Sequence, residues 1–226
     1  TFRLIAANLN FSTTRNKIVN SIDTLSRNVQ LVKPMNVNGY FQGSSFVTLG
    51  LPFKNPKLKG SSLNFTNSMS YTRDVSLLYK QLNTGNIIAV SQGAGININK
   101  DKFDVGVRLN IAYTDVTYSV NTLLNEDYFT QTYSGDFSYN FPKNFIFATN
   151  FDYLVNTGRA EGFNQSIPLW NASFSKQVFK KKNGEIKFSV NDILNQNENI
   201  SRTTGDNYIQ DTRSMVLRRY FMVSLL

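Results

Sequence analysis

The stretch Asp104-Val-Gly-Val-Arg-Leu-Asn-Ile-Ala-Tyr113 decides the fold class, because polar or small residues alternate with larger apolar ones along its whole length. A period of two places successive side chains on opposite faces of a β-strand. The larger apolar set is Val105, Val107, Leu109, Ile111 and Tyr113, and the other set is Asp104, Gly106, Arg108, Asn110 and Ala112. The stretch therefore predicts a strand with one apolar and one polar face.

The same alternation recurs on both sides of this strand, in residues 63–71, 133–141 and 145–153. Short turn-forming stretches (54–60, 99–102, 142–144 and 180–184) alternate with longer polar ones (81–85, 121–127, 157–165 and 197–213). Short turns at one end of a sheet and longer loops at the other are typical of an outer-membrane barrel, with the short turns on the periplasmic side. We therefore expect an all-β chain: an antiparallel transmembrane β-barrel in which 1–226 is a single domain.

The spacing predicts about ten strands, with both termini at the short-turn end. The expected limits are 2–24, 29–53, 60–78, 86–98, 103–119, 129–141, 145–156, 167–179, 185–195 and 214–226. In the first pair, Ile18, Ile22, Leu25, Val29 and Val32 also fit a helical spacing. The segment is rich in residues that disfavour helix interiors, so a long hairpin that projects beyond the membrane is preferred.

The composition limits the kinds of catalysis and ligand binding that the chain can carry out. The chain has 226 residues with no His and no Cys, which excludes disulfides, thiol nucleophiles, a Ser-His-Asp triad and His- or Cys-ligated zinc. We expect no enzymatic activity and no cofactor. The formal charge is +9, from 24 basic and 15 acidic residues, but many basic residues lie in the short turns. Solvated turns explain this better than a nucleic-acid partner does. No run of 18 apolar residues predicts a membrane helix.

Two sets of residues are candidates for function. Alternation points one set toward a barrel lumen: Asn64, Ser68, Arg108, Asn110, Asp136, Asn140, Asn150, Asp152, Lys187 and Asn191. These side chains could line a substrate path or contact a plug, or they could form the wetted wall of any barrel. The other set borders the turns and predicts two aromatic girdles at the headgroup levels: Phe53, Phe103, Phe141, Phe145, Phe179, Tyr71, Tyr79, Tyr118, Tyr128 and Tyr133.

Charged residues near the loops leave alternatives open. Arg218 and Arg219 are adjacent, so one of them should point toward lipid and extend to the headgroups. Acidic residues gather in the predicted loops, at Glu126, Asp127, Glu161, Glu198, Asp206 and Asp211. Calcium could bind there through oxygen ligands, but no calcium-loop spacing is present, and solvated loop charges are favoured.

The C-terminal region carries a more specific signal. Phe188-Ser-Val-Asn-Asp-Ile-Leu-Asn-Gln-Asn197, then Ile200-Ser-Arg202, then Val216-Leu-Arg-Arg-Tyr-Phe-Met-Val-Ser224 resembles the end of the Bacteroidetes outer-membrane β-barrel family, which is related to TonB-dependent receptors. Asn28–Pro34 followed by Asn36–Gly39 resembles another barrel segment of those proteins. The similarity runs over essentially the whole chain, yet covers only about half of such a barrel.

The resemblance implies the C-terminal barrel portion of a TonB-dependent-receptor-like transporter, forming the wall for nutrient uptake across the bacterial outer membrane. The implied partners are outer-membrane lipid, the rest of the barrel, a plug domain, an energy-coupling TonB system and a surface lipoprotein. The family's plug has no counterpart in the sequence, and the chain stops at Leu226 without the usual final aromatic residue. Two alternatives remain: a complete ten-strand barrel acting as a pore or structural protein, and a soluble β-sandwich for binding or adhesion.

Overall fold

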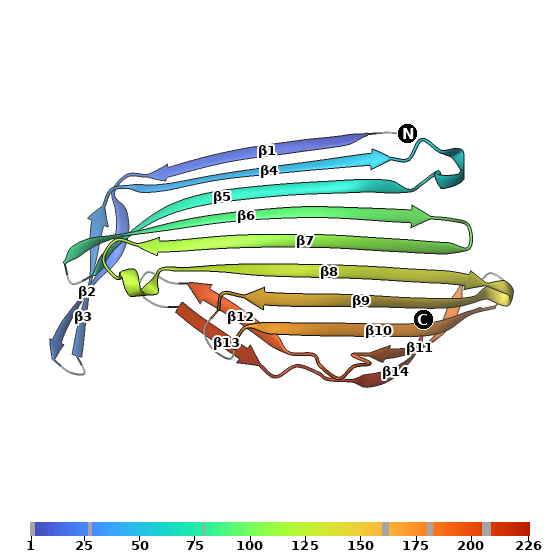
Figure 1. Cartoon of the computed structure of the whole chain (residues 1–226). Coiled ribbons are helices and arrows are strands. Elements are labelled where there is room, and N and C mark those ends of the chain that lie inside the picture. The colour runs from blue at the N-terminus through green and yellow to red at the C-terminus, as the bar shows by residue number, and fades with distance from the viewer. Residues whose placement is uncertain (1–2, 27–28, 79, 160–162, 180–182, 205–208) are drawn as a thin grey trace.

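A ten-stranded antiparallel path dominates the structure. In the computed structural model of the protein, the described residues are 3–26, 29–78, 80–159, 163–179, 183–204 and 209–226. The path runs in the order β1-β4-β5-β6-β7-β8-β9-β10-β11-β14 (Figure 1). Its strands are β1 (Leu4–Thr14), β4 (Tyr40–Pro52), β5 (Ser62–Leu78), β6 (Gln81–Asn99), β7 (Phe103–Tyr118), β8 (Glu126–Phe141), β9 (Phe145–Thr157), β10 (Gln165–Val178), β11 (Gly184–Asn191) and β14 (Tyr220–Leu225).

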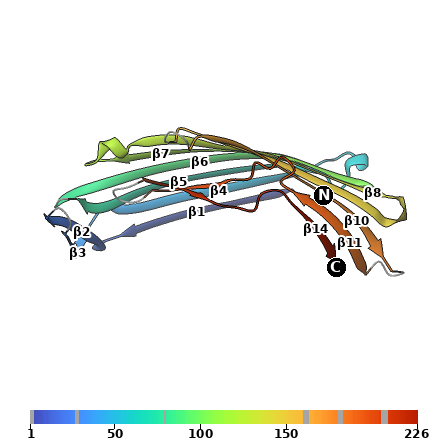
Figure 2. The same cartoon turned by 90° about the horizontal axis from the view of Figure 1, so that it is seen from below.

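The predicted all-β antiparallel architecture of about ten strands is confirmed, but the sheet is not closed. Among the described residues, the outermost strands β1 and β14 each pair on one side only. The sheet is bent into an arc, as Figure 2 shows. Two strands at an open edge leave their outward backbone N–H and C=O groups without partners in the sheet.

The predicted difference between the two ends of the sheet is also present. The connections through the 3₁₀ turns η1 (Pro56–Leu58) and η3 (Pro142–Asn144), and the short connection after Asn99, lie at the same end as both termini (Figure 1). The 3₁₀ turn η2 (Thr122–Leu124) lies at the opposite end, which we call the loop end. One predicted loop is wrong, because residues 81–85 belong to β6. This strand begins directly after Lys80, a turn residue with a left-handed backbone (φ 66°).

The first predicted hairpin exists, but each of its long strands breaks into two. The chain bends between β1 and β2 (Lys17–Ser26) at Asn16 (φ 53°), and between β3 (Val29–Val37) and β4 at Gly39 (φ +112°). The Asn16 backbone N–H donates a 2.8 Å hydrogen bond to the Asn38 side chain, which joins the two bends. Asn and Gly tolerate these left-handed conformations, so β2 and β3 can turn away from the main path. Ser21 and Ile22 then pair in parallel with the end of β5.

The C-terminal strand limits differ most from the prediction. β11 ends at Asn191 instead of 195, and the expected strand over 214–226 is reduced to β14. The expected loop between them contains a separate two-stranded hairpin, β12 (Asn199–Thr204) and β13 (Ile209–Ser214). Figure 1 shows this hairpin near the loop ends of β8, β9 and β10.

Continuous pairing registers give the main sheet one apolar and one polar face. Val107, for example, pairs with Ile96 on one side and with Gly135 on the other, and Leu109 pairs with Ala94 and Tyr133. The apolar face lacks a covering protein layer: Val107 is 53% exposed and Phe188 is 46% exposed. No helix in the described part of the chain is long and apolar enough to cross a membrane.

Candidate functional site

The polar face gathers all ten candidates for the lumen. They come from β5, β7, β8, β9 and β11, and the registers of these strands place every one of them on the same face as Asn97 and Ser91 of β6. Alternation along each strand combined with antiparallel pairing is sufficient to produce this wall. That the wall surrounds a lumen remains a prediction, because the sheet is open.

An ion pair crosses the middle of the polar wall. Arg108 Nη2 lies 2.5 Å from Asp136 Oδ1, and the two side chains are 53% and 39% exposed. The Asp136 carboxylate extends across Gly106, where an added Cβ would lie 2.6 Å from both of its oxygens. Gly106 therefore provides the space that lets Asp136 reach Arg108.

Shallow hollows on this face bring several of the candidates together. Asp136, Asn150, Lys187 and Asn191 contribute to a hollow of about 570 Å³ that Tyr220 of β14 also lines. A second hollow of about 200 Å³ is lined by Asn64, Arg108 and Asn110, and a third of about 260 Å³ includes Ser68. Asn140 and Asp152 line none of these three hollows. Apolar side chains also project from this face, among them Met222 and Phe46.

Part of the predicted girdle lies on the apolar face. At the short-turn end, the Phe145 ring stacks on Phe174 with centroids 5.4 Å apart, and Phe141 lies 6.5 Å from Phe174. Phe103 shares their face, while Phe53 and Phe179 lie just beyond their strands. Tyr71 and Tyr133 are also on the apolar face and contact Phe41 and Tyr153, but they lie near the middle of β5 and β8 and do not border the loops as predicted.

Two predicted girdle residues are on the wrong face for lipid contact. The register places Tyr118 and Tyr128 on the polar face, and Tyr118 is only 6% exposed. Counting alternate positions would have shown this, from Tyr113 for Tyr118 on β7 and from Tyr133 for Tyr128 on β8. Tyr79 lies outside the described residues.

Tyr128 belongs instead to a buried charged cluster at the loop end. Arg202 of β12 lies with its guanidinium 5.4 Å from the centre of the Tyr128 ring, and that of Arg159 lies 5.7 Å from it. Arg202 Nη1 donates a 2.6 Å hydrogen bond to Glu126 Oε2, and Arg202 Nε and Nη2 donate to the two oxygens of Asp211 at 2.7 and 2.6 Å. The side chains of Arg202, Asp211 and Glu126 are 2%, 7% and 16% exposed. We call these five residues the loop-end cluster.

Burial and hydrogen bonding shift the pKa values of this cluster in different directions. Burial raises the pKa of Glu126, although the charge of Arg202 acts to lower it. The hydrogen bond from Arg202 lowers the pKa of Asp211, and burial lowers the pKa of Arg159. Glu126 Oε1 and Arg159 Nε and Nη1 are buried and have no hydrogen-bond partner within the described structure. Glu126 is therefore the carboxylate in the cluster that loses its charge most readily.

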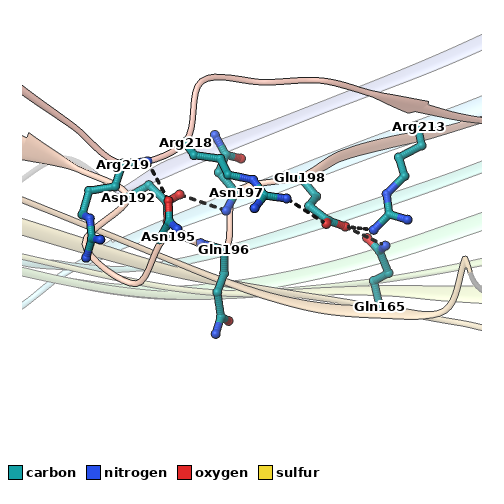
Figure 3. Close-up of polar contacts among 9 residues, drawn as sticks. All are labelled: Gln165, Asp192, Asn195, Gln196, Asn197, Glu198, Arg213, Arg218 and Arg219. Carbon is teal, nitrogen blue, oxygen red and sulfur yellow. Dashed lines mark hydrogen bonds and ion pairs between the residues drawn. The ribbon is translucent and has the colours of Figure 1, made fainter.

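The motif that carries the family resemblance folds into a tight turn, shown in Figure 3. Asp192 is 3% exposed with a left-handed backbone (φ 51°), and its two carboxylate oxygens accept hydrogen bonds from the backbone N–H groups of Gln196 and Asn197 at 2.9 and 3.0 Å. Asn171 of β10 accepts a 2.8 Å hydrogen bond from the Asp192 N–H. The motif thus fixes the chain where it leaves β11 toward the hairpin.

Glu198 ties the base of the hairpin to the sheet. It accepts hydrogen bonds from Arg213 at 2.5 Å and from Gln165 of β10 at 3.1 Å, and Arg218 lies 3.7 Å away (Figure 3). The hydrogen bond from Arg213 lowers the pKa of Glu198. The predicted placement of Arg218 or Arg219 on a lipid-facing strand is wrong, because both precede β14. Arg219 instead donates to the Ile193 carbonyl at 3.3 Å.

The predicted solvated loop acids are largely paired. Glu126, Asp211 and Glu198 bind arginines, whereas Glu161 and Asp206 lie outside the described residues. In the described part of the chain, no group of three or more acidic side chains could hold a metal ion. Sequence reasoning missed Arg202, Arg159 and Gln165, and no local pattern singles them out.

Comparison with known proteins decides the family. A model of the outer membrane protein beta-barrel family matches residues 1–226. The chain belongs to this family. This outer membrane β-barrel protein therefore resides in the bacterial outer membrane, with lipid against its apolar face. No curated protein and no solved structure matches it.

Proposed function

We propose that this outer membrane β-barrel protein forms part of the wall of a TonB-dependent-receptor-like transporter for nutrient uptake and has no enzymatic activity. The carrying observation is the open sheet: a continuous apolar face ends at β1 and β14, neither of which has a second partner among the described residues. Backbone groups facing hydrocarbon must be hydrogen-bonded, so each of these edges needs a strand partner in the membrane.

Further strands of the same barrel are the proposed partners of these edges. β1 offers 11 residues and β14 only 6, so the two edges differ in length. Such a larger barrel would enclose enough space for the plug and the energy coupling that the C-terminal resemblance implies. A surface lipoprotein would then meet the barrel at its loop end.

A second candidate is a self-closed ten-strand pore or structural barrel. The first and last strands of an even-numbered antiparallel path run in opposite directions, so β1 and β14 have the relative direction that closure needs. The soluble β-sandwich has less support, because the described sheets do not form the two large facing layers that it requires.

A cysteine pair separates the two candidates. These 226 residues contain no cysteine, so Asn8→Cys on β1 and Ser224→Cys on β14 would be the only thiols within them. In outer membranes isolated from cells that express the full-length protein, we expect no disulfide between them. A disulfide in the heat-modifiable, folded protein would support the closed ten-strand barrel. The matched control is Asn10→Cys with Ser44→Cys, which face each other on the paired strands β1 and β4 and should cross-link in either case.

Energy-coupled uptake needs its own test. Deletion of the gene is expected to abolish growth on particular members of a panel of sole nutrients, and deletion of the TonB component should give the same defects. Growth that survives loss of TonB but not loss of this gene would contradict energy coupling and favour a passive pore.

A further inference from the structure

The hairpin β12–β13 is attached to the main sheet in an unusual way. It forms its own two-stranded sheet, and within the described residues neither strand pairs with the ten-stranded path. Its ties to the body of the sheet are side-chain contacts at two places. Arg202 reaches Glu126 on β8, and Glu198, at its base, reaches Gln165 on β10.

These ties place the hairpin over the polar face. Glu126 and Tyr128 belong to the polar half of the β8 alternation, and Arg202 contacts both of them. Beside Tyr128 on the same face, Asn156 of β9 is only 2% exposed, and Ile167 of β10 is 5% exposed. Most of the sheet is exposed or half-exposed on both faces, so this buried patch requires a covering layer.

The attachment of the hairpin to the sheet depends on a small number of charged and polar side chains. A buried ion pair that loses one partner leaves the other charge without compensation in a low-dielectric setting, which is strongly unfavourable. A backbone ladder would have to break many bonds in sequence, whereas among the described residues the side chain of Arg202 supplies the ion pair and the ring contact to β8.

We infer that β12–β13 is a latched lid over the loop end of the barrel's polar face, and that the Arg202–Glu126 ion pair is its latch. The Asp192 turn fixes one end of the lid, and residues 215–219 connect the other end to β14. Met215 is fully exposed and Leu217 is 76% exposed, so their side chains do not pack against the sheet. Opening would uncover Asn156 and its neighbours without separating any strands of the main path.

Cysteine labelling can detect the opening. Asn156→Cys introduces a single thiol beneath the lid of the full-length chain in outer membranes, and a water-soluble maleimide reports its accessibility. We expect slow labelling with the latch intact. Adding Arg202→Gln should make it at least roughly tenfold faster, because Glu126 and Asp211 then lose their shared partner. Glu198→Gln, at the more exposed second tie, should give a smaller increase.

The controls separate opening from general loosening. Ser68→Cys lies on the polar face of β5, and its labelling should be equal with and without Arg202→Gln. Arg108→Gln removes an ion pair of the same face away from the hairpin and should leave the thiol introduced by Asn156→Cys protected. Rapid labelling of that thiol in the otherwise natural chain would overturn the inference. So would equal labelling with and without Arg202→Gln and Glu198→Gln in protein that keeps its heat-modifiable mobility.

The lid does not depend on the cargo or on energy coupling. A self-closed pore could carry it as well as a receptor could. Loss of protection therefore tests the latch alone, whereas the cysteine pair across β1 and β14 tests the barrel.

Discussion

Arg202 and Glu126 form an ion pair of 2.6 Å although 76 positions separate them in the chain. Arg202 also holds Asp211 within its own hairpin, so one guanidinium serves two carboxylates. The pair links a loop hairpin to the first residue of β8, and it determines how the loop end of the sheet is covered.

Mild acid should hold the hairpin against β8, and only stronger acid should disrupt the hairpin itself. The raised pKa of Glu126 means that its ionised form costs the folded state stability and that Glu126 is protonated first as the pH falls, so this protonation favours the state in which Glu126 is buried. The lowered pKa of Asp211 contributes stability above the usual aspartate range, and this is lost only as the pH falls through its lower folded value. The charged neighbours of Glu126 are Arg202, Arg159 and Asp211.

Spin labels can follow this response. With cysteines at Asp127 of β8 and Ser201 of β12, the distance distribution between the labels should narrow as the pH falls from about 7.5 to about 5, above the usual carboxylate range. Glu126→Gln should remove the pH response, because no carboxylate remains there to titrate. An unchanged response in that variant would assign the transition to another group.

Two arginines that pair with acidic residues of β8 should differ sharply in how much they stabilise the protein. Arg202→Met leaves Glu126 and Asp211 buried without their partner, and we expect a loss of about 3–5 kcal/mol. Arg108→Met removes an exposed pair and should cost less than about 1 kcal/mol. Urea unfolding in lipid vesicles measures both. Similar losses would contradict the difference in burial between their pairs, with side chains 2% and 53% exposed.

The assignment of the two faces predicts opposite tolerance of charge. Val107→Arg places a guanidinium on the apolar face, and we expect a loss of about 2–4 kcal/mol if the site is near the bilayer midplane. Asn110→Arg, three positions along the same strand and on the polar face, should be nearly neutral. Vesicle unfolding and heat-modifiable mobility provide the measurements. Greater damage from Asn110→Arg would reverse the faces.

Two glycines on facing strands should respond differently to an added methyl group. At Gly106, a Cβ would lie 2.6 Å from the Asp136 carboxylate oxygens, so Gly106→Ala must displace Asp136 from Arg108. At Gly135 nothing lies within 4 Å, and Gly135→Ala should be neutral or stabilising because alanine restricts the unfolded chain. Unfolding midpoints in urea compare the two variants. Equal midpoints would show that Asp136 moves aside at no cost.

The Asp192 turn should depend on both of its carboxylate oxygens. Asp192→Ala removes the acceptors for two backbone N–H groups, and we expect a loss of about 1–3 kcal/mol. Asp192→Asn keeps one acceptor and should retain part of the stability. Asp101→Ala, in an exposed turn at the other end, is the control. Limited proteolysis after residue 192 gives a local readout, and identical cleavage in all variants would contradict this role for Asp192.

Local patterns predicted much of this protein. Alternation predicted the apolar and polar faces, and all ten candidates from Asn64 to Asn191 lie on one face. The bend at Asn16 and Gly39 was not predicted, because left-handed residues permit a bend without requiring one. Tyr118 and Tyr128 were misplaced because they lie near strand ends, although alternation along each strand, from Tyr113 on β7 and from Tyr133 on β8, predicts the polar face for both.

The sequence by itself determined the faces, the difference between the two ends and the family, because strand period and turn composition are local properties that neighbouring residues express together. Only the tertiary structure decided that Arg202 meets Glu126, that Asp192 closes a turn and that a hairpin covers the loop end of the polar face. These contacts join residues far apart in the chain. Their pairing depends on how the strands align and how the connections return over the sheet, which no local pattern encodes.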